Sequence, residues 1–466
     1  MVEKIRKSLR ESKTARWAAL AIVAFTMLCG YYLTDVMAPL KGLLENQLGW
    51  NSNEYGFFTS AYGWFNVFLF MLIIGGIILD KMGIRFTGIM ATSIMVIGAS
   101  LKYYAISTHS LDGITWHILW FDAKAQVMLA ALGYAIFGVG VEVAGITVSK
   151  TIVKWFKGKE MALAMGLEMA TARIGTALAL ATSVPIANSL GHVSKPILMA
   201  LIMLCIGLIG FIVYVFMDVK LDKENAEFNK ENNIVDEEEA FRISDIFKII
   251  TNKGWWYIAL LCVLFYSAVF PFLKYATDLM VQKFNVDQEW AGIIPAMLPF
   301  GTILLTPFFG NLYDRKGKGA TIMMIGSILL IFVHSMFAIP FINHWLIAIV
   351  LIIILGIGFS LVPSAMWPSV PKIIPENQLG SAYSLIFWVQ NWGLMGVPAL
   401  IGWVLDKYCV IGYRALPDGK AVAMYDYTLP MVIFTSFSVL ALIYAFLLKA
   451  EDKKKGYGLE LPNIKK

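Results

Sequence analysis

The chain has 466 residues, of which 58% are hydrophobic and only 15% are charged. A soluble domain carries roughly 25% charged residues, so the composition excludes an ordinary soluble protein. The mean hydropathy of +0.69 is typical of a chain that lies mostly in lipid. The formal net charge of +6 comes from Lys and Arg in short loops and tails, where such residues set membrane orientation. We therefore expect a lipid-bilayer partner and no nucleic-acid partner.

The N-terminal half begins with a basic tail, residues 1–16, that has no small-residue cleavage site and so does not indicate a cleaved signal peptide. Six apolar runs follow, most of them close to or above the roughly 20 residues that a spanning helix needs. These runs predict spans near 17–40, 54–79, 86–106, 125–153, 160–188 and 195–217. Together they predict an N-terminal bundle over 17–217.

The middle of the chain, residues 218–253, is charged and poor in apolar residues until its end. It predicts a linker with a short amphipathic helix at "ISDIFKII". Six further spans are expected near 254–283, 288–312, 319–340, 344–370, 379–405 and 427–449. They predict a C-terminal bundle over 254–449 and a tail over 450–466. The predicted fold is an all-α membrane protein with twelve transmembrane helices in two six-helix bundles.

Basic residues predict the orientation of these spans. The tails, the linker and the loops "DKMGIR", "KWFKGK" and "DRKGKG" all fall on one side, which the positive-inside rule makes cytoplasmic. Three basic residues in the alternate loops are exceptions: Lys407, Arg414 and Lys420. Two long loops, 101–124 and 407–427, are expected on the outer side.

A short motif occurs twice, each time after the second span of a half. The first copy, "GGIILDKMGIR", contains Gly76, Asp80, Lys81, Gly83 and Arg85; the second, "FGNLYDRKGKG", contains Gly310, Asp314, Arg315, Gly317 and Gly319. Two parallel six-span repeats are the layout of a carrier. This layout resembles the major facilitator superfamily over almost the whole chain. That resemblance implies a cytoplasmic latch in which the motif's acid pairs with nearby basic residues; ordinary solvated loop charge is the alternative.

Two charges stand inside apolar runs of the first half, Glu142 and Arg173. Charges in membrane helices are costly and are usually functional. The segment around them aligns without gaps to "LGIGFSLVPSAMWPSVPKIIPENQLGSAYSLIFWVQNWG", which places Ser360 opposite Glu142 and Asn391 opposite Arg173. The helices therefore repeat while the charges do not. Because the fold alone does not demand these charges, their presence in one half indicates a one-sided binding site.

The depth of the two charges supports this interpretation. Glu142 lies 13 residues before Trp155, and Arg173 lies 13 residues after Glu160. At about 1.5 Å per residue, both lie about 20 Å from the turn that joins their helices. That depth is near the bilayer midplane, where carriers bind substrate. A structural salt bridge between Glu142 and Arg173 is the alternative, and the pair could close on itself when no substrate is bound.

One fixed cation and one fixed anion suit a zwitterionic substrate. Arg173 is suited to bidentate capture of a carboxylate, and Glu142 would bind an ammonium group. Six further residues are candidates for the cavity wall: Tyr32, Tyr62, Tyr266, Trp388, Gln390 and Asn391. The aromatic residues could equally pack in the core or face lipid. The amides are stronger candidates, because an amide exposed to lipid is costly.

A closer resemblance rests on "KWFKGKEMALAMGLEMATARIG", "FYSAVFPF" and "AMWPSVPKIIPENQLGSAYSLIFWVQNWG". These segments are similar to the branch that contains the lysosomal dipeptide transporter of animals. The resemblance implies that Glu142 and Arg173 serve the charged ends of a peptide, and it favours facilitated diffusion. The chain has no acidic dileucine signal in its N-terminal tail and no N-x-[ST] sequon. We therefore expect a multi-pass monomer in a prokaryotic inner (plasma) membrane, with both termini cytoplasmic and without an accessory glycoprotein.

Other intramembrane charges leave the coupling open. Asp35 and Glu168 are candidates for proton coupling, although hydration or local pairing is the alternative. Lys274 and Asp278 are spaced for a pair along one helix. The histidines and the four cysteines lack metal or redox spacing, so no metal and no cofactor are expected.

The sequence therefore predicts an alternating-access carrier of short peptides, first of all zwitterionic dipeptides, working by facilitated diffusion or by proton coupling. A carrier of organic anions or phosphate esters is the alternative within transport. A transporter-like sensor that binds a ligand without moving it is the alternative from another class. No nucleophile–base constellation is present in the sequence, so an enzyme is not expected.

Overall fold

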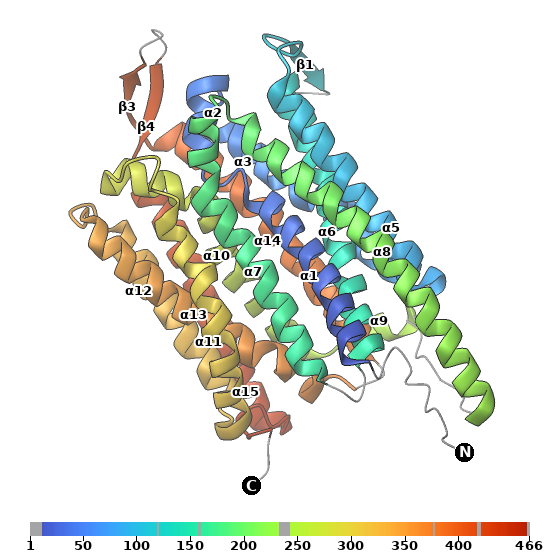
Figure 1. The fold of residues 1–466 in the computed structure, drawn as a ribbon. Helices are drawn as coiled ribbons and strands as arrows, with labels where there is room; N and C mark the ends of the chain where they lie inside the picture. The colour runs from blue at the N-terminus through green and yellow to red at the C-terminus, as the bar shows by residue number, and fades with distance from the viewer. Residues whose placement is uncertain are drawn as a thin grey trace.

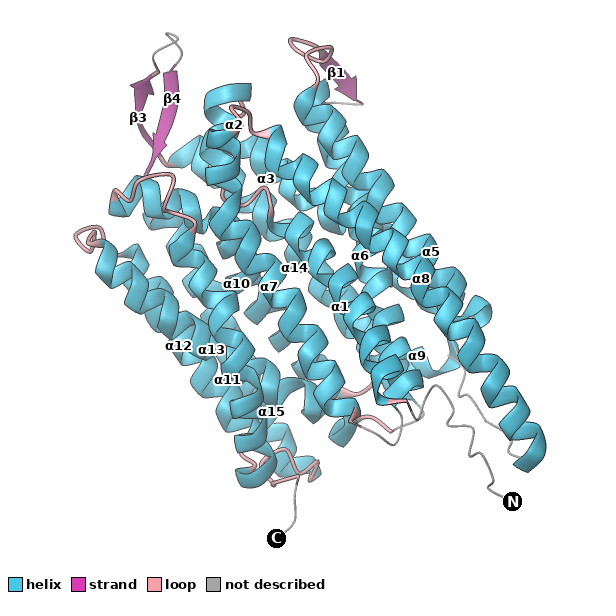
Figure 2. Ribbon diagram, in the orientation of Figure 1, coloured by secondary structure: helices cyan, strands magenta, loops and turns pink. Residues whose placement is uncertain are grey.

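The computed structural model describes residues 12–118, 121–156, 160–232, 243–375, 378–416 and 421–463. Long helices run side by side, and two short β-hairpins lie at one end of the bundle (Figures 1 and 2). The first helix begins and the last helix ends at the opposite end. We call these two ends the hairpin side and the terminal side.

The first half contains eight α-helices, one short 3₁₀-helix and a two-stranded hairpin. They are α1 (Lys13–Asp35), α2 (Lys41–Leu48), α3 (Ser52–Ser60), η1 (Ala61–Gly63), α4 (Trp64–Phe68), α5 (Met71–Ser107), β1 (Thr115–Ile118), β2 (Phe121–Lys124), α6 (Ala125–Phe156), α7 (Met161–Ser189) and α8 (Ser194–Asn232). The strands β1 and β2 pair antiparallel in the long loop that the sequence predicted after the third span.

The second half begins at a short helix over "ISDIFKII", as the sequence predicted. Its elements are α9 (Ile243–Ile250), α10 (Lys253–Phe284), α11 (Ile293–Lys316), α12 (Gly319–Ala338), α13 (Trp345–Ile373), α14 (Leu379–Tyr408), β3 (Val410–Ala415), β4 (Ala421–Tyr425) and α15 (Thr428–Lys455). The predicted linker is only partly covered, since residues 233–242 lie outside the described part of the chain.

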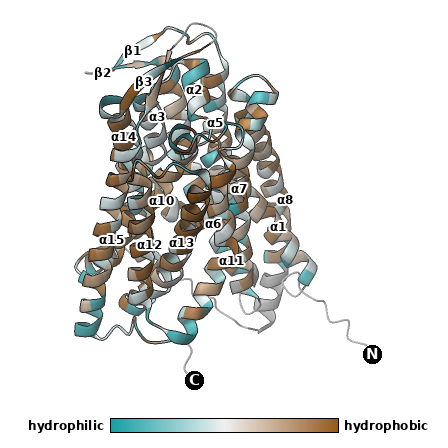
Figure 3. Cartoon of the chain, turned by 90° about the vertical axis from the view of Figure 1, so that its left-hand side faces the viewer, coloured by the Kyte–Doolittle hydropathy of each residue, from teal (hydrophilic) through white to brown (hydrophobic). Residues whose placement is uncertain are grey.

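Eleven of the described helices are long and apolar enough to cross a membrane. One of them, α5, contains parts of two spans that meet at Gly83, where φ is 78°. Hydrophobic residues occupy the middle of the helices, and hydrophilic residues gather toward the two ends (Figure 3). The predicted all-α fold with twelve membrane spans is therefore confirmed.

The second span, predicted near 54–79, is not one continuous helix. It is divided into α3, η1, α4 and the start of α5, and Phe70 at the last break has a φ of 53°. The indole Nε1 of Trp388 on α14 donates to the Val67 carbonyl at 3.1 Å. The Phe70 ring also stacks on Trp388, with 5.5 Å between centroids. Irregular backbone at membrane depth persists only where neighbours satisfy its polar groups, as Trp388 does here.

Two glycines near Glu142 and Arg173 in the sequence bring the first-half helices close together. A Cβ on Gly138 of α6 would lie 2.3 Å from the Tyr62 carbonyl oxygen, and one on Gly175 of α7 would lie 2.3 Å from the Leu28 carbonyl oxygen. Only a residue without a side chain allows such backbone contact. These contacts fix the positions of α6 and α7 within one helical turn of Glu142 and Arg173.

Candidate functional site

Glu142 is positioned by residues from both halves of the molecule. The Tyr62 hydroxyl, on η1, donates to Glu142 Oε1 at 2.7 Å. The Asn391 side chain, on α14 of the second half, lies close enough to interact with the same carboxylate. Glu142 is partly exposed, so its carboxylate is not fully enclosed by these neighbours.

Arg173 is held by two aromatic rings of the second half. Its guanidinium carbon lies 5.0 Å from the centroid of Phe359 on α13 and 5.5 Å from the centroid of Phe270 on α10. The two rings meet edge to face at 5.5 Å. Cation–π contact of this kind attracts a guanidinium without neutralising its charge. Arg173 is also partly exposed and therefore keeps hydrogen-bond donors for a ligand.

The two opposite charges do not form an ion pair with each other, although the structure describes both side chains. The structural salt bridge that the sequence left open is therefore not the arrangement found. An isolated charge at membrane depth is costly, and partial exposure reduces that cost. The geometry leaves one anionic and one cationic group, each partly exposed, among residues from both halves.

Two more residues belong to this electrostatic environment. Tyr31 on α1 lies within electrostatic range of Glu142, Glu168 and Arg173. Glu168 precedes Arg173 on α7 and interacts with its charge. We define the central site as the group Tyr31, Tyr62, Glu142, Glu168, Arg173, Phe270, Phe359 and Asn391.

Three other sequence-predicted site residues make their contacts with other groups. Tyr32 is 1% exposed, and its hydroxyl shares a 3.0 Å hydrogen bond with Thr182 on α7. Gln390 is buried and accepts a weak contact from Cys262 Sγ at 3.6 Å. Trp388 supports the break in the second span. None of these contacts is with Glu142 or Arg173.

Tyr266 occupies an intermediate position behind the central site. Its ring stacks on Phe270 at 5.1 Å, and its hydroxyl accepts a hydrogen bond from Trp367 Nε1 at 3.2 Å. Tyr266 also lies within electrostatic range of Arg173. It therefore orients the aromatic wall that faces Arg173.

The internal repeat contained a signal for two neighbours of the charges. Asn391 aligns with Arg173, yet it faces Glu142; Phe359 precedes Ser360, the counterpart of Glu142, yet it faces Arg173. Glu142 is thus contacted by the second-half residue that aligns with Arg173. Arg173 is contacted by the neighbour of the second-half residue that aligns with Glu142. The missed residues Tyr31 and Phe270 carried no comparable signal.

Asp35 is engaged in a contact between the halves. Lys274 Nζ, on α10, lies 2.6 Å from Asp35 Oδ1, and Thr176 Oγ1 donates to Asp35 Oδ2 at 2.7 Å. Lys274 also donates to the Thr34 carbonyl at 2.7 Å. The spacing of Lys274 and Asp278 along α10 allowed a pair between them. Lys274 instead pairs with Asp35 across the interface between the halves.

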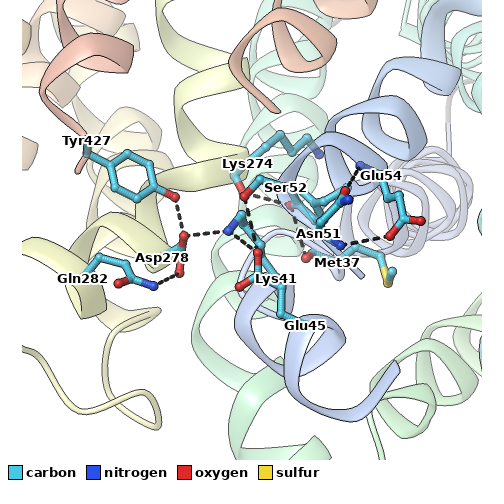
Figure 4. Close-up of polar contacts among 11 residues, drawn as sticks. Met37, Lys41, Glu45, Asn51, Ser52, Glu54, Lys274, Asp278, Gln282 and Tyr427 are labelled. Atoms are coloured by element: carbon cyan, nitrogen blue, oxygen red, sulfur yellow. Dashed lines mark hydrogen bonds and ion pairs between the residues drawn. The ribbon is translucent and has the colours of Figure 1, made fainter. Parts of the chain in front are cut away.

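A second ion pair joins the halves on the hairpin side (Figure 4). Lys41 Nζ on α2 lies 2.7 Å from Glu45 Oε1 and 2.8 Å from Asp278 Oδ2 on α10. The hydroxyl of Tyr427, which precedes α15, donates to the same Asp278 oxygen. We call Lys41, Glu45, Asp278 and Tyr427 the hairpin-side cluster.

The first motif copy lies within the first half on the terminal side. Asp80 Oδ1 lies 3.1 Å from Lys150 Nζ on α6, and Arg85 Nε lies 2.9 Å from Asp218 Oδ2 on α8. Gly83 supplies the positive φ between the two parts of α5. Gly76 faces open space, and Lys81 is exposed.

The second copy contacts the C-terminal segment instead. Asn463 Nδ2 donates to Asp314 Oδ1 at 2.7 Å, and Arg315 Nε donates to Asn311 at 3.0 Å. A Cβ on Gly317, where φ is 68°, would lie 2.5 Å from the Glu460 carbonyl oxygen. Gly310 faces open space.

Two cavities were found outside the central site. An apolar cavity of about 460 Å³ lies between α7, α11 and α13, and a polar one of about 20 Å³ lies beside the hairpin-side cluster. Among the described residues, no group of three or more Asp, Glu, His or Cys side chains is arranged to hold a metal ion.

Comparison with known proteins shows which transporters this chain is similar to. The chain is 27% identical to the lysosomal dipeptide transporter MFSD1 of Mus musculus over 404 residues, covering 84% of this chain and 80% of that protein. It is 27% identical to the Danio rerio protein of the same name over 456 residues, covering 96% and 89%. A crystal structure of a nucleoside transporter NupG mutant superposes with a TM-score of 0.66 at 16% identity, covering 93% of this chain and 98% of that one.

The family follows from the sequence itself. A family model described as Major Facilitator Superfamily matches residues 20–398, which is most of the chain. The spans, the repeated motif and the superposition on a solved transporter all agree with that match. The chain belongs to the Major Facilitator Superfamily.

Proposed function

We propose that this chain is an alternating-access carrier of short zwitterionic peptides, first of all dipeptides. The observation that carries the proposal is that Glu142 and Arg173 lie within membrane-spanning helices and do not pair with each other. A peptide supplies the complementary charges. Its carboxylate binds Arg173 through a bidentate pair of hydrogen bonds, and its ammonium group binds Glu142. The dipeptide transporters among the relatives support this choice of substrate.

The mechanism follows from which half holds each charge. Glu142 and Arg173 belong to the first half, whereas Asn391, Phe270 and Phe359 belong to the second. A substrate that neutralises both charges draws them away from these uncharged neighbours. It thereby changes the contacts between the halves and favours their movement around the site.

We further propose facilitated diffusion by a monomer in a prokaryotic inner membrane, with the terminal side cytoplasmic. Asp35 is bound to Lys274 and Thr176, which disfavours it as a free proton carrier. The basic loops on the terminal side support the orientation. Among the alternatives, a phosphate-ester carrier would be expected to present more than one cation at the site.

Uptake of a radiolabelled dipeptide into proteoliposomes tests this function. We expect saturable uptake without an imposed proton gradient, lost in Glu142→Gln and in Arg173→Gln but kept in Glu54→Gln, whose carboxylate pairs with Lys124 on the hairpin side. Binding without uptake would favour the sensor. Uptake of phosphate esters or organic anions, without uptake of dipeptides, would show that these anions and not peptides are the substrates. Alkalinisation outside the vesicles during dipeptide uptake would show that transport is coupled to protons and is not facilitated diffusion.

A further inference from the structure

The hairpin-side cluster contains one cation between two anions. Lys41, Glu45 and Asp278 are each no more than 5% exposed. Lys41 donates to both carboxylates, so the cluster carries one excess negative charge when both are ionised. Buried charge is costly unless it is paired and hydrogen-bonded. Something must therefore neutralise one carboxylate while the cluster is closed.

The hydrogen bonds indicate which carboxylate that is. Asp278 receives donors on both oxygens, from Lys41, Tyr427 and Gln282. Glu45 Oε1 receives donors from Lys41 at 2.7 Å and Ser52 at 3.3 Å. Glu45 Oε2 is buried and forms no hydrogen bond, although the Tyr425 hydroxyl also interacts with this carboxyl group. An ionised oxygen left without a donor is unfavourable, whereas a protonated oxygen becomes a donor itself.

The polar cavity beside the cluster offers acceptors to such a donor. It holds about 20 Å³ and is lined by Glu45, Asn46 and Thr277 among others. Asn46 Oδ1 and Thr277 Oγ1 are buried there without partners. A space of this size accommodates one water molecule, which can relay a hydrogen bond. Arg414 lines the cavity from the exposed strand β3, but it forms an ion pair with neither carboxylate.

We propose that Glu45 binds one proton while the hairpin side is closed and releases it when the halves separate there. The proton enters from the solution on the hairpin side and sits on Oε2, facing the acceptors of the cavity. It leaves to the same solution, so no net proton transport is required. The site is distinct from Glu142 and Arg173, and the proposal does not depend on the substrate.

The electrostatic environment agrees with this proposal. Burial raises the pKa of Glu45, Lys41 partly offsets the rise, and Asp278 adds to it. The titratable and charged groups that face the cluster are Lys41, Glu54, Tyr55, Tyr275, Asp278, Asp406, Arg414, Tyr425 and Tyr427. A raised pKa means that the closed state holds the proton more tightly than the open or unfolded state. Stability of the closed state is therefore greatest at low pH and falls as pH rises through that raised pKa.

Infrared spectroscopy of the purified protein near neutral pH tests the proposal directly. We expect a protonated-carboxyl band that is absent in Glu45→Gln and retained in Glu54→Gln. It should also be retained in Arg414→Gln, which removes the cation at the cavity rim. A wild-type spectrum without any protonated-carboxyl band would overturn the proposal even if the Glu45→Gln variant failed to fold, as would a protonated-carboxyl spectrum that this variant leaves unchanged.

Thermal unfolding gives the second readout. As the pH rises above the ordinary pKa of a glutamate, the melting temperature of the wild type should fall, and the Glu45→Gln variant should lose most of that dependence. The same measurement with and without sodium separates a proton from a metal cation. Stabilisation by sodium at every pH, with no pH dependence removed by the variant, would assign the cavity to a metal cation and overturn the proposal.

Discussion

Glu142 and Arg173 keep their charges available because their neighbours are weaker partners than a ligand's charges. A cation–π contact contributes about 0.5–2 kcal/mol, and a hydrogen bond to a charged group about 1.5–3 kcal/mol. A bidentate carboxylate at Arg173 adds two charge-assisted hydrogen bonds, which outweigh the rings of Phe270 and Phe359. In the proposed function, substrate binding at the residue scale is thus an exchange of weak contacts for strong ones.

Removing the Tyr62 hydroxyl should weaken substrate binding. In Tyr62→Phe, Glu142 loses the donor that orients its carboxylate, and we expect dipeptide affinity to fall about 10-fold to 100-fold, as a lost charge-assisted hydrogen bond implies. Isothermal calorimetry on the purified protein would measure this. The matched control is Tyr32→Phe, which loses only the contact with Thr182. Equal losses in the two variants would contradict the assignment of Tyr62 to the site.

The divided second span is the element that connects the site to the interface. Its 3₁₀ segment carries Tyr62, and its last break, at Phe70, rests on Trp388 of the other half. A rotation of α14 against this span therefore moves the support of the break and the neighbours of Glu142 together. Carriers commonly build binding sites at such discontinuous helices.

Trp388→Phe tests this role of the element. The change keeps an aromatic ring but leaves the Val67 carbonyl without its donor, which should cost about 1–3 kcal/mol. We expect a lower melting temperature and slower transport. Trp392→Phe is the control, because Trp392 contacts the ring of Phe68 at 5.8 Å and is 44% exposed. If the control lowers both quantities as much, the indole hydrogen bond is not what supports the break.

The sequence could predict the spans because bilayer thickness fixes their length: the span expected over 125–153 is α6, Ala125–Phe156. It could not predict the break at Phe70, since no proline marks it and its positive φ is stabilised by α14. The charges Glu142 and Arg173 stood out by their cost in lipid. Their aromatic and amide neighbours come from distant helices, so only tertiary packing reveals them.

Ion pairs join the two halves of the molecule on its hairpin side. Lys274–Asp35 and Lys41–Asp278 join the two halves there, whereas Asp80–Lys150 lies within the first half on the terminal side. Breaking a buried pair by removing one partner costs about 3–5 kcal/mol. In the proposed cycle, these pairs hold the hairpin side closed and must separate before substrate passes.

Lys274→Met should shift the molecule toward the state that is open on the hairpin side. Asp35 loses its cation, so the closed state alone is destabilised. A cysteine placed at Met37, which is 3% exposed, would report opening by faster labelling, in a background with the partly exposed Cys205 replaced by Ser. Lys124→Met is the control, because Lys124 pairs with Glu54 inside the first half. Unchanged labelling in Lys274→Met would show that this pair does not hold the gate.

The central claim is that Glu142 and Arg173 bind opposite ends of one peptide, and capped peptides test it most directly. The measurement is the affinity of a free, an N-acetylated and a C-amidated dipeptide for the wild type, Glu142→Gln and Arg173→Gln. Each cap should cost the wild type about 1.5–3 kcal/mol. Acetylation should cost almost nothing further in Glu142→Gln, and amidation almost nothing further in Arg173→Gln, because the partner of the capped end is already absent. Equal costs of both caps in all three proteins would contradict the account.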